Sequence, residues 1–259
     1  MTLAFEVLAS GSKGNAILVS SARTRILVDA GLNGRETIDR LQVTRRLIRP
    51  QALVISHEHV DHVRGLGVLS RRFDLPVYLT QGTLSGLPAS AGRAAKTEVV
   101  RAGQPFTVGD LCVTAFTVPH DAAEPVAFVI EHDGLRLGIC TDLGTGTDAV
   151  EQQLMGCQAL ILEANHDSDL LWNGPYPGFL KKRVAGRFGH LSNQQTCDLL
   201  SSLHHGALQT VVLAHLSEVN NTPEIVRREM ARLRAAPKWG AVRFELANQH
   251  QTLPSIALV

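Results

Sequence analysis

The sequence predicts a layered α/β fold, and three features of the chain support this prediction. Short β-rich runs separated by turn residues dominate the first 142 residues, and helical and strand patterns alternate after that point. The clustered polar groups fall at the ends of apolar runs, which is where an open α/β sheet presents its functional groups. A β-rich first half followed by alternating helices and strands is typical of helices packed against sheets.

The first half is expected to consist mainly of strands separated by turns such as GSKG and SAR. The expected strands occupy 3–9, 15–20, 24–30, 52–57, 77–80, 97–101, 106–118, 127–133 and 135–142. Helices are expected over 34–42 and 62–73, and the second begins inside a histidine-rich segment.

The second half alternates between the two kinds of element. Helical patterns cover 148–157, 193–206 and 223–236, and strand patterns cover 159–164, 210–215 and 242–247. No repeat, low-complexity tract or long linker interrupts the chain, so we expect a single domain over 1–259. Residues 168–189 are expected to form a looser excursion from that domain.

The composition is that of an ordinary soluble globular protein, with 44% hydrophobic and 19% charged residues. A formal net charge of +1 carries no global signature for nucleic acid or membranes, so an anionic partner would need a local basic patch. The start MTLAFEVLAS lacks the features of a secretion signal, and no apolar run is long enough to span a membrane. We therefore expect a cytoplasmic protein whose scattered cysteines are free thiols: Cys112, Cys140, Cys157 and Cys197.

The segment HEHVDH, which follows the apolar run ALVIS, is the strongest chemical signal in the chain. His57 and His59 point the same way if the chain is still extended there, and Asp61 and His62 follow at the turn into the next helix. Imidazole nitrogens and carboxylate oxygens are the ligands expected for zinc, manganese or iron. A histidine-rich surface cluster is the alternative, but the position directly after a buried strand argues against it.

Further candidate ligands fall at the ends of other expected strands: His120 in VPHD, Asp142 in GICTD, Glu163 in ALILEA and His215 in VVLAH. Because strand ends meet at one edge of an open α/β sheet, these side chains can converge with HEHVDH around two adjacent ions.

The order HxHxDH, His, Asp, His resembles the metallo-β-lactamase-fold hydrolases over nearly the whole chain. Within that superfamily the chain resembles the bacterial YycJ-type (WalJ-like) branch, which is DNA exonuclease-like. The segments that carry the branch likeness are LASGSKGNAILV, SHEHVDHVRGL, PHDAAEPVAF, ICTDLG, LEANHD, PYPGFLKKRVAGRFGHLSN and AHLSEVNNTPE. The resemblance implies a four-layer αββα sandwich with the site on the rim between two sheets.

Carried over position by position, the resemblance implies two divalent ions, zinc or manganese, with iron also compatible. His57, His59 and His120 resemble the ligands of the first ion, with Asp121 competing with His120 for that place. Asp61, His62 and His215 resemble the ligands of the second ion, and Asp142 resembles the bridging carboxylate.

The same resemblance implies the catalytic chemistry. Two cations roughly 3.5–4 Å apart can share a hydroxide and stabilise an in-line displacement at a phosphodiester. Asp61 would orient that nucleophile. GHLSN resembles the HST segment of ribonuclease Z, so His190 would assist at the scissile phosphate and Glu163 would orient His190. A loop histidine that packs locally is the alternative interpretation of His190.

Substrate contacts are expected from a basic segment and a helix start. Lys181, Lys182 and Arg183, followed by Arg187 and preceded by Trp172, Tyr176 and Phe179, could follow a sugar–phosphate backbone by charge and stacking. A solvated helix face is the alternative. Ser192 or Asn193 would cap the next helix, whose N-terminus favours a phosphate.

These observations predict a dinuclear metal-dependent phosphodiesterase that uses a metal-bridging hydroxide as a nuclease, with DNA favoured over RNA as substrate. The alternative enzyme is a metal-dependent hydrolase of a small thioester, lactone, lactam or cyclic phosphodiester. An iron oxidoreductase on the same scaffold is disfavoured because His59 stands where the diiron flavoprotein relatives carry glutamate. A metal-stabilised interaction module is disfavoured by the complete ligand set. The oligomeric state stays open.

Overall fold

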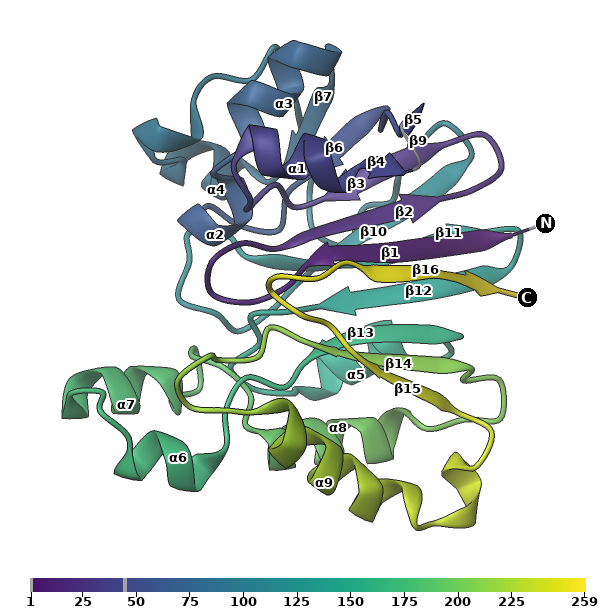
Figure 1. The fold of residues 1–259 in the computed structure, drawn as a ribbon. Helices are drawn as coiled ribbons and strands as arrows, with labels where there is room; N and C mark the ends of the chain where they lie inside the picture. The colour runs from purple at the N-terminus through teal and green to yellow at the C-terminus, as the bar shows by residue number, and fades with distance from the viewer. Residues whose placement is uncertain (1, 44–45) are drawn as a thin grey trace.

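A computed structural model describes residues 2–43 and 46–259 and has four layers. Two mixed seven-stranded sheets face each other, and helices cover the outer face of each sheet (Figure 1). The expected αββα sandwich is therefore confirmed. Among the described residues, no helix has the length and apolar character needed to cross a membrane.

The first sheet has the strand order β16-β1-β2-β3-β6-β7-β8. Its strands are β1 (Leu3–Ala9), β2 (Ala16–Ser20), β3 (Arg25–Val28), β6 (Ala52–Val54), β7 (Pro76–Leu79), β8 (Lys96–Val99) and β16 (Leu253–Leu258). β3, β6, β7 and β8 run parallel to one another, so the segments after β3 and β6 leave the sheet at the same edge. A separate short hairpin joins β4 (Gln42–Val43) and β5 (Arg46–Leu47).

The second sheet has the order β15-β14-β13-β12-β11-β10-β9. Its strands are β9 (Phe106–Val108), β10 (Leu111–Thr117), β11 (Val126–His132), β12 (Leu135–Cys140), β13 (Ala159–Glu163), β14 (Thr210–Ala214) and β15 (Arg243–Leu246). β12 to β15 are parallel, so their carboxyl ends also share one edge. The two edges that carry the functional groups lie next to each other.

The central core lies between the sheets, where alternate residues of each strand meet. Phe5 and Val19 of the first sheet and Phe128 and Ile139 of the second belong to one buried cluster. Because side chains alternate across a strand, the intervening residues face the helices on the outer sides. Because both faces of each sheet are covered, many of the strands are apolar on both faces.

The helices divide between the two outer faces. The first sheet is covered by α1 (Gly34–Arg40), α2 (Val60–Val63), α3 (Leu66–Phe73) and α4 (Gln81–Gly86), with a 3₁₀ turn over Ala89–Ala91. The second sheet is covered by α5 (Asp148–Leu154), α8 (Asn193–Leu203) and α9 (Pro223–Arg234), with a 3₁₀ turn over Pro237–Trp239. Two short helices, α6 (Ser168–Asn173) and α7 (Gly178–Val184), extend away from the sandwich (Figure 1).

One expectation about local structure was wrong, and the structure adds detail to two others. The helix expected over 62–73 is two helices, because at Gly65 the backbone approaches Leu32 so closely that a Cβ would lie 2.5 Å from its carbonyl oxygen. The β character expected over 106–118 is a hairpin that turns at Gly109, which has a φ of 57°. The expected loose excursion over 168–189 contains α6 and α7, and the Asp167 side chain caps α6.

Candidate metal centre

The candidate centre lies where the adjoining edges of the two sheets meet. His57 and His59 follow β6, and Asp61 and His62 lie on α2. From the second sheet, His120 follows β10, Asp142 follows β12, Glu163 ends β13 and His215 follows β14. Glu163 is the last residue of β13, Asp61 and His62 lie on α2, and the other positions lie just beyond a strand end.

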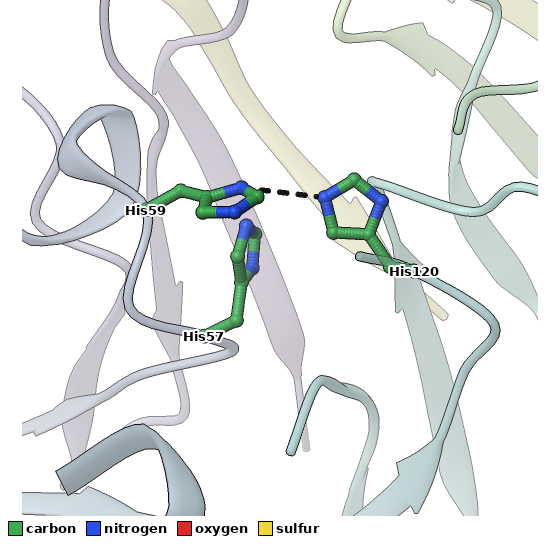
Figure 2. A group of neighbouring side chains, drawn as sticks. All are labelled: His57, His59 and His120. Atoms are coloured by element: carbon green, nitrogen blue, oxygen red, sulfur yellow. Dashed lines mark hydrogen bonds between the residues drawn. The ribbon is translucent and has the colours of Figure 1, made fainter. Parts of the chain in front are cut away.

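The structure brings together the seven side chains that the sequence identified as candidate ligands. Nitrogens of His57, His59 and His120 lie within 4.8 Å of one another, and the three rings approach from both sheets (Figure 2). A second group with the same spacing contains Asp61, His62 and His215. Asp142 joins the two sets, because it forms such groups with His57 and His62 and also with His120 and His190.

Several of these atoms are buried without a hydrogen-bond partner, which is the condition a metal ion would relieve. Nε2 of His57 has none, and neither ring nitrogen of His215 has one. The carboxylate oxygens of Asp61 and Asp142 lie 3.5 and 3.6 Å from the His215 ring. An unpaired buried polar atom is destabilising by about 1–3 kcal/mol. Imidazole and carboxylate donors held in this way fit divalent zinc, manganese or iron.

Backbone strain marks the same place. Asp29, Asp142 and His215 adopt left-handed backbone conformations, with φ of 60°, 58° and 53°. Such a conformation is destabilising by on the order of 1–3 kcal/mol for a residue with a side chain, and it persists only where the surroundings enforce it. Asp29 and His215 directly follow a strand, Asp142 lies two residues after one, and all three turn their side chains into the cluster.

The charges in the cluster keep the carboxylates ionised. Burial alone would raise the pKa of Asp142, but the neighbouring His215 and His62 rings hold it well below its usual value. Asp61 behaves in the same way, with the His62 and His215 rings holding its pKa below the usual range against the effect of burial. Burial, with the His62 ring beside it, holds the pKa of His57 well below its usual value. His57 therefore presents the neutral imidazole that coordinates a metal.

The second nitrogen of two candidate ligands is bonded to the protein. His62 Nδ1 donates to the buried Asp29 carboxylate at 2.8 Å, and His120 Nδ1 donates to the Gly189 carbonyl oxygen at 3.1 Å. Such bonds set the tautomer and leave Nε2 as the ring nitrogen that faces the cluster, where it lies 3.1 Å from Asn15 Nδ2 in His62 and 3.4 Å from His59 Nδ1 in His120. Asp121, the competing candidate, lies outside the ligand groups, and its carboxylate pairs with Arg183. The geometry thus favours His120.

Sequence reasoning missed three residues that support the cluster. Asp29 also accepts from the Ser56 backbone N–H at 2.9 Å, and Ser56 Oγ lies 3.0 Å from His57 Nδ1. Asn15 Nδ2 lies 3.1 Å from His62 Nε2. The signal for Asp29 was present, because it ends the run RILVD and obeys the strand-end rule used for the other residues. Asn15 lies in a glycine-rich turn that carried no comparable signal.

His190 and Glu163 form the expected contact. His190 Nδ1 donates to Glu163 Oε1 at 2.7 Å, and Glu163 Oε2 accepts from the Leu143 backbone N–H at 2.7 Å. Burial would lower the pKa of His190, but the fully buried Glu163 carboxylate raises it above its ordinary value. His190 is therefore held in place and favoured in its protonated form at the edge of the candidate centre.

The predicted substrate contacts divide into two groups. Lys181, Lys182 and Arg183 lie together on α7, and Arg183 also lines the cavity at the candidate centre. Ser192 and Asn193 do not face that cavity, and both side chains are buried. Ser192 caps α8 in a capping box with Gln195, and Asn193 is hydrogen-bonded to Asn221. Their hydrogen-bonding capacity is used within the protein, so the structure does not support them as substrate contacts.

The chain matches one family model and full-length relatives. Residues 24–216 match the model described as the beta-lactamase superfamily domain. The chain is 33% identical to exodeoxyribonuclease YycJ of Bacillus anthracis, over 98% of each chain. It is 31% identical to exodeoxyribonuclease WalJ of Streptococcus pneumoniae serotype 2, over 87% of this chain and 86% of the relative.

Solved structures share the fold at lower identity. The metallo-beta-lactamase fold protein YhfI of Bacillus subtilis superposes with a TM-score of 0.74 at 16% identity, over 99% of each chain. Zinc-bound PqqB of Methylobacterium extorquens superposes with a TM-score of 0.70 at 21% identity, over 97% of this chain and 99% of PqqB. At these identities the likeness concerns the fold alone.

Proposed function

This chain belongs to the β-lactamase superfamily, and on that premise we propose that it is a dinuclear metal-dependent phosphodiesterase that acts as an exonuclease on DNA. The observation that carries the proposal is the pair of ligand groups joined by Asp142, with buried ring nitrogens that have no partner in the protein. The full-length similarity to relatives named as exodeoxyribonucleases supports DNA as the substrate.

The chain's own residues would hold the two ions in separate sets. His57, His59 and His120 form one set, and Asp61, His62 and His215 form the other, with Asp142 between them. Two divalent ions held there would supply an activated water and neutralise the charge that develops on the phosphate. Because Asp61 stays ionised, it can accept a hydrogen bond from the attacking water and orient it.

His190 and Glu163 would act on the leaving oxygen. A protonated His190 can donate from Nε2, because Nδ1–H is already bonded to Glu163. A positioned general acid of this kind contributes about 10²–10⁴-fold to the rate. His190 is the group that would donate this proton, and Glu163 is a positioning residue that holds the ring and keeps it charged.

The path of the DNA would follow α7. Lys182 is exposed, and Arg183 reaches the cavity while pairing with Asp121. Trp172 and Phe179, which are 51% and 74% exposed, lie on α6 and α7 beside these cations. Cations together with exposed aromatic rings are the combination that binds a nucleic-acid strand without reading its sequence.

The proposal is tested with His59→Ala and Asp142→Ala, with His250→Ala as the matched control. His250 is an exposed histidine whose ring pairs with Glu218 on the surface. Elemental analysis is expected to find less bound metal in the first two variants and an unchanged content in His250→Ala. Cleavage of end-labelled duplex DNA is expected to be lost with the metal.

The choice of substrates separates the competing functions. End-labelled duplex and single-stranded DNA, RNA and closed circular DNA are compared with bis(p-nitrophenyl) phosphate and with small thioesters and lactones. Exonuclease action predicts mononucleotide release from linear DNA and none from closed circles. Rapid turnover of a thioester or lactone without cleavage of DNA would instead identify a small-molecule hydrolase, and full activity of either metal-site variant would refute the dinuclear centre.

A further inference from the structure

The residues that line the cavity at the candidate centre fall into two chemical groups, here called its two walls. Its volume is about 220 Å³. One wall carries the charged and metal-ligating groups His59, Asp61, Asp142, His190 and His215, and Asp121 and Arg183 pair across its edge. The other wall carries no charged group among the residues the structure describes, and consists of Ser12, Asn165, Tyr176, Leu180, Val184, Gly189, Ser217 and Asn220. The neutral wall has no role in the phosphodiester chemistry proposed above.

Asn220 is the unexplained residue of the neutral wall. It is 1% exposed, and neither its side-chain oxygen nor its side-chain nitrogen has a hydrogen-bond partner. Its backbone is fully engaged, because its N–H donates to Ser217 Oγ and its carbonyl accepts from the Asp167 N–H. An orphan carboxamide beside an active-site cavity points to a polar partner that arrives with the substrate.

The adjacent Asn221 is a useful comparison, because all of its side-chain hydrogen bonds are made to other groups of the protein. Its Nδ2 donates to the carbonyl oxygens of Ala164 and Asn165 at 2.9 and 3.1 Å. Its Oδ1 accepts from Asn193 Nδ2 and from the Thr222 N–H. These two neighbouring residues of the same type thus differ completely, because only the Asn220 amide lacks a partner within the protein.

The chemistry of a free carboxamide identifies the group it can match. It offers a donor and an acceptor side by side, whereas a phosphate offers acceptors alone and would leave the amide oxygen unpaired. The edges of nucleobases carry an adjacent donor and acceptor, and asparagine pairs with them in two-point contacts. Tyr176, in the same wall, provides an aromatic ring on which a base can stack.

Resting on the proposed function, we propose that the neutral wall around Asn220 and Tyr176 binds the nucleobase next to the scissile phosphate. The cavity is below the roughly 300–1,000 Å³ of a site for a drug-sized ligand, so it accepts one base-sized group rather than a stretch of strand. Recognition of a single terminal nucleotide explains a preference for chain ends. Because a carboxamide can turn to match either arrangement of donor and acceptor, this contact does not select one base.

The test compares two duplexes that differ in the terminal nucleotide alone, which is either natural or an abasic tetrahydrofuran residue. The wild-type protein is expected to prefer the natural end by more than tenfold in kcat/KM, because a two-point neutral hydrogen bond to Asn220 accounts for about tenfold and stacking on Tyr176 adds to it. In Asn220→Ala, and in the volume-keeping Asn220→Leu, this preference is expected to fall about tenfold, to the part that stacking on Tyr176 contributes. Both variants should fold, because removing an unpaired buried polar group does not destabilise the protein.

Asn221→Ala is the matched control. It is expected to lower the melting temperature while keeping the preference for the natural end, since its amide bonds only protein groups. If Asn220→Ala cleaves both duplexes more slowly by the same factor, or keeps the full wild-type preference for the natural end, the base site is overturned. Failure of the wild-type protein to cleave either duplex or bis(p-nitrophenyl) phosphate would instead refute the phosphodiesterase itself, so the two failures are distinguishable.

Discussion

Replacing Glu163 by glutamine tests the proposed role of His190 with a minimal change of shape. The Glu163 carboxylate is fully buried and accepts two hydrogen bonds of 2.7 Å, from His190 Nδ1 and from the Leu143 backbone N–H. Glutamine keeps the size but has a single oxygen. One of the two donors must therefore face an amide N–H group.

The structure decides which donor loses its acceptor. The Leu143 N–H is part of the backbone and cannot change, whereas the His190 ring can move its proton to Nε2. His190 in the variant thus receives a hydrogen bond at Nδ1 and loses the carboxylate that raises its pKa. We expect kcat on DNA to fall about 100-fold, at the lower end of the contribution of a general acid. The free energy of unfolding should fall by about 2 kcal/mol, the value of one buried hydrogen bond to a charged group.

The assay compares DNA with bis(p-nitrophenyl) phosphate, whose nitrophenolate leaves without needing a proton. Glu163→Gln should slow DNA cleavage far more than hydrolysis of the nitrophenyl ester, with metal content unchanged. In a His190→Ala background the same substitution should have little further effect on kcat, because both changes remove one function. Equal losses on both substrates, a full additional loss in the His190→Ala background, or loss of metal would refute this reasoning.

Three further predictions concern DNA binding and stability. Changing Lys181, Lys182 and Arg183 together to alanine should weaken DNA binding. Each lost phosphate contact lowers the slope of the logarithm of the binding constant against the logarithm of salt concentration by about 0.9, so the three changes should lower it by at most about 3. An unchanged slope would exclude α7 from the DNA path. Burial lowers the pKa of His166 to about 4, so the folded protein favours the neutral ring. Its contribution to stability is present above the unfolded pKa of about 6.5 and is lost as the pH falls towards 4. Urea unfolding of His166→Gln between pH 7.5 and 4 should therefore show a weaker loss of stability than the wild type, by on the order of 3 kcal/mol, and parallel curves would contradict the assignment. Ser192→Ala should lower the free energy of unfolding by about 1 kcal/mol through loss of the α8 cap, with DNA affinity unchanged; a loss of affinity without a loss of stability would return Ser192 to the substrate contacts.

Much of the candidate centre could be predicted from the sequence, because many of its residues follow strands. The alternation of apolar runs and turns located the strand ends, and the residue types at those ends identified His57, His59, Asp142 and His215 as candidates. The same rule would have found Asp29, which ends the run before the first helix. It could not find Asn15, because a glycine-rich turn shows no periodicity from which the direction of a side chain could be derived.

The ends of the helices were harder to predict than the strand ends, because tertiary contacts determine where these helices begin and end. The pattern over 62–73 is continuous in sequence, but the close approach of Gly65 to Leu32 breaks it into α2 and α3. The sequence pattern over 168–189 did not predict helices there, because α6 and α7 are short and partly exposed to solvent. Short helices depend on caps and contacts more than on propensity, so the Asp167 cap that starts α6 is the feature that matters there.

The sequence by itself determined the fold class, the strand ends and the kinds of group that gather there, because periodicity and residue chemistry are local properties. Only the tertiary structure decided which atoms remain free to bind. His120 differs from Asp121 in lying within a ligand group, and Asn220 differs from Asn221 in having an amide without a partner in the protein. Hydrogen-bond partners are set by distances between residues far apart in the chain, and those distances exist once the two sheets have packed together.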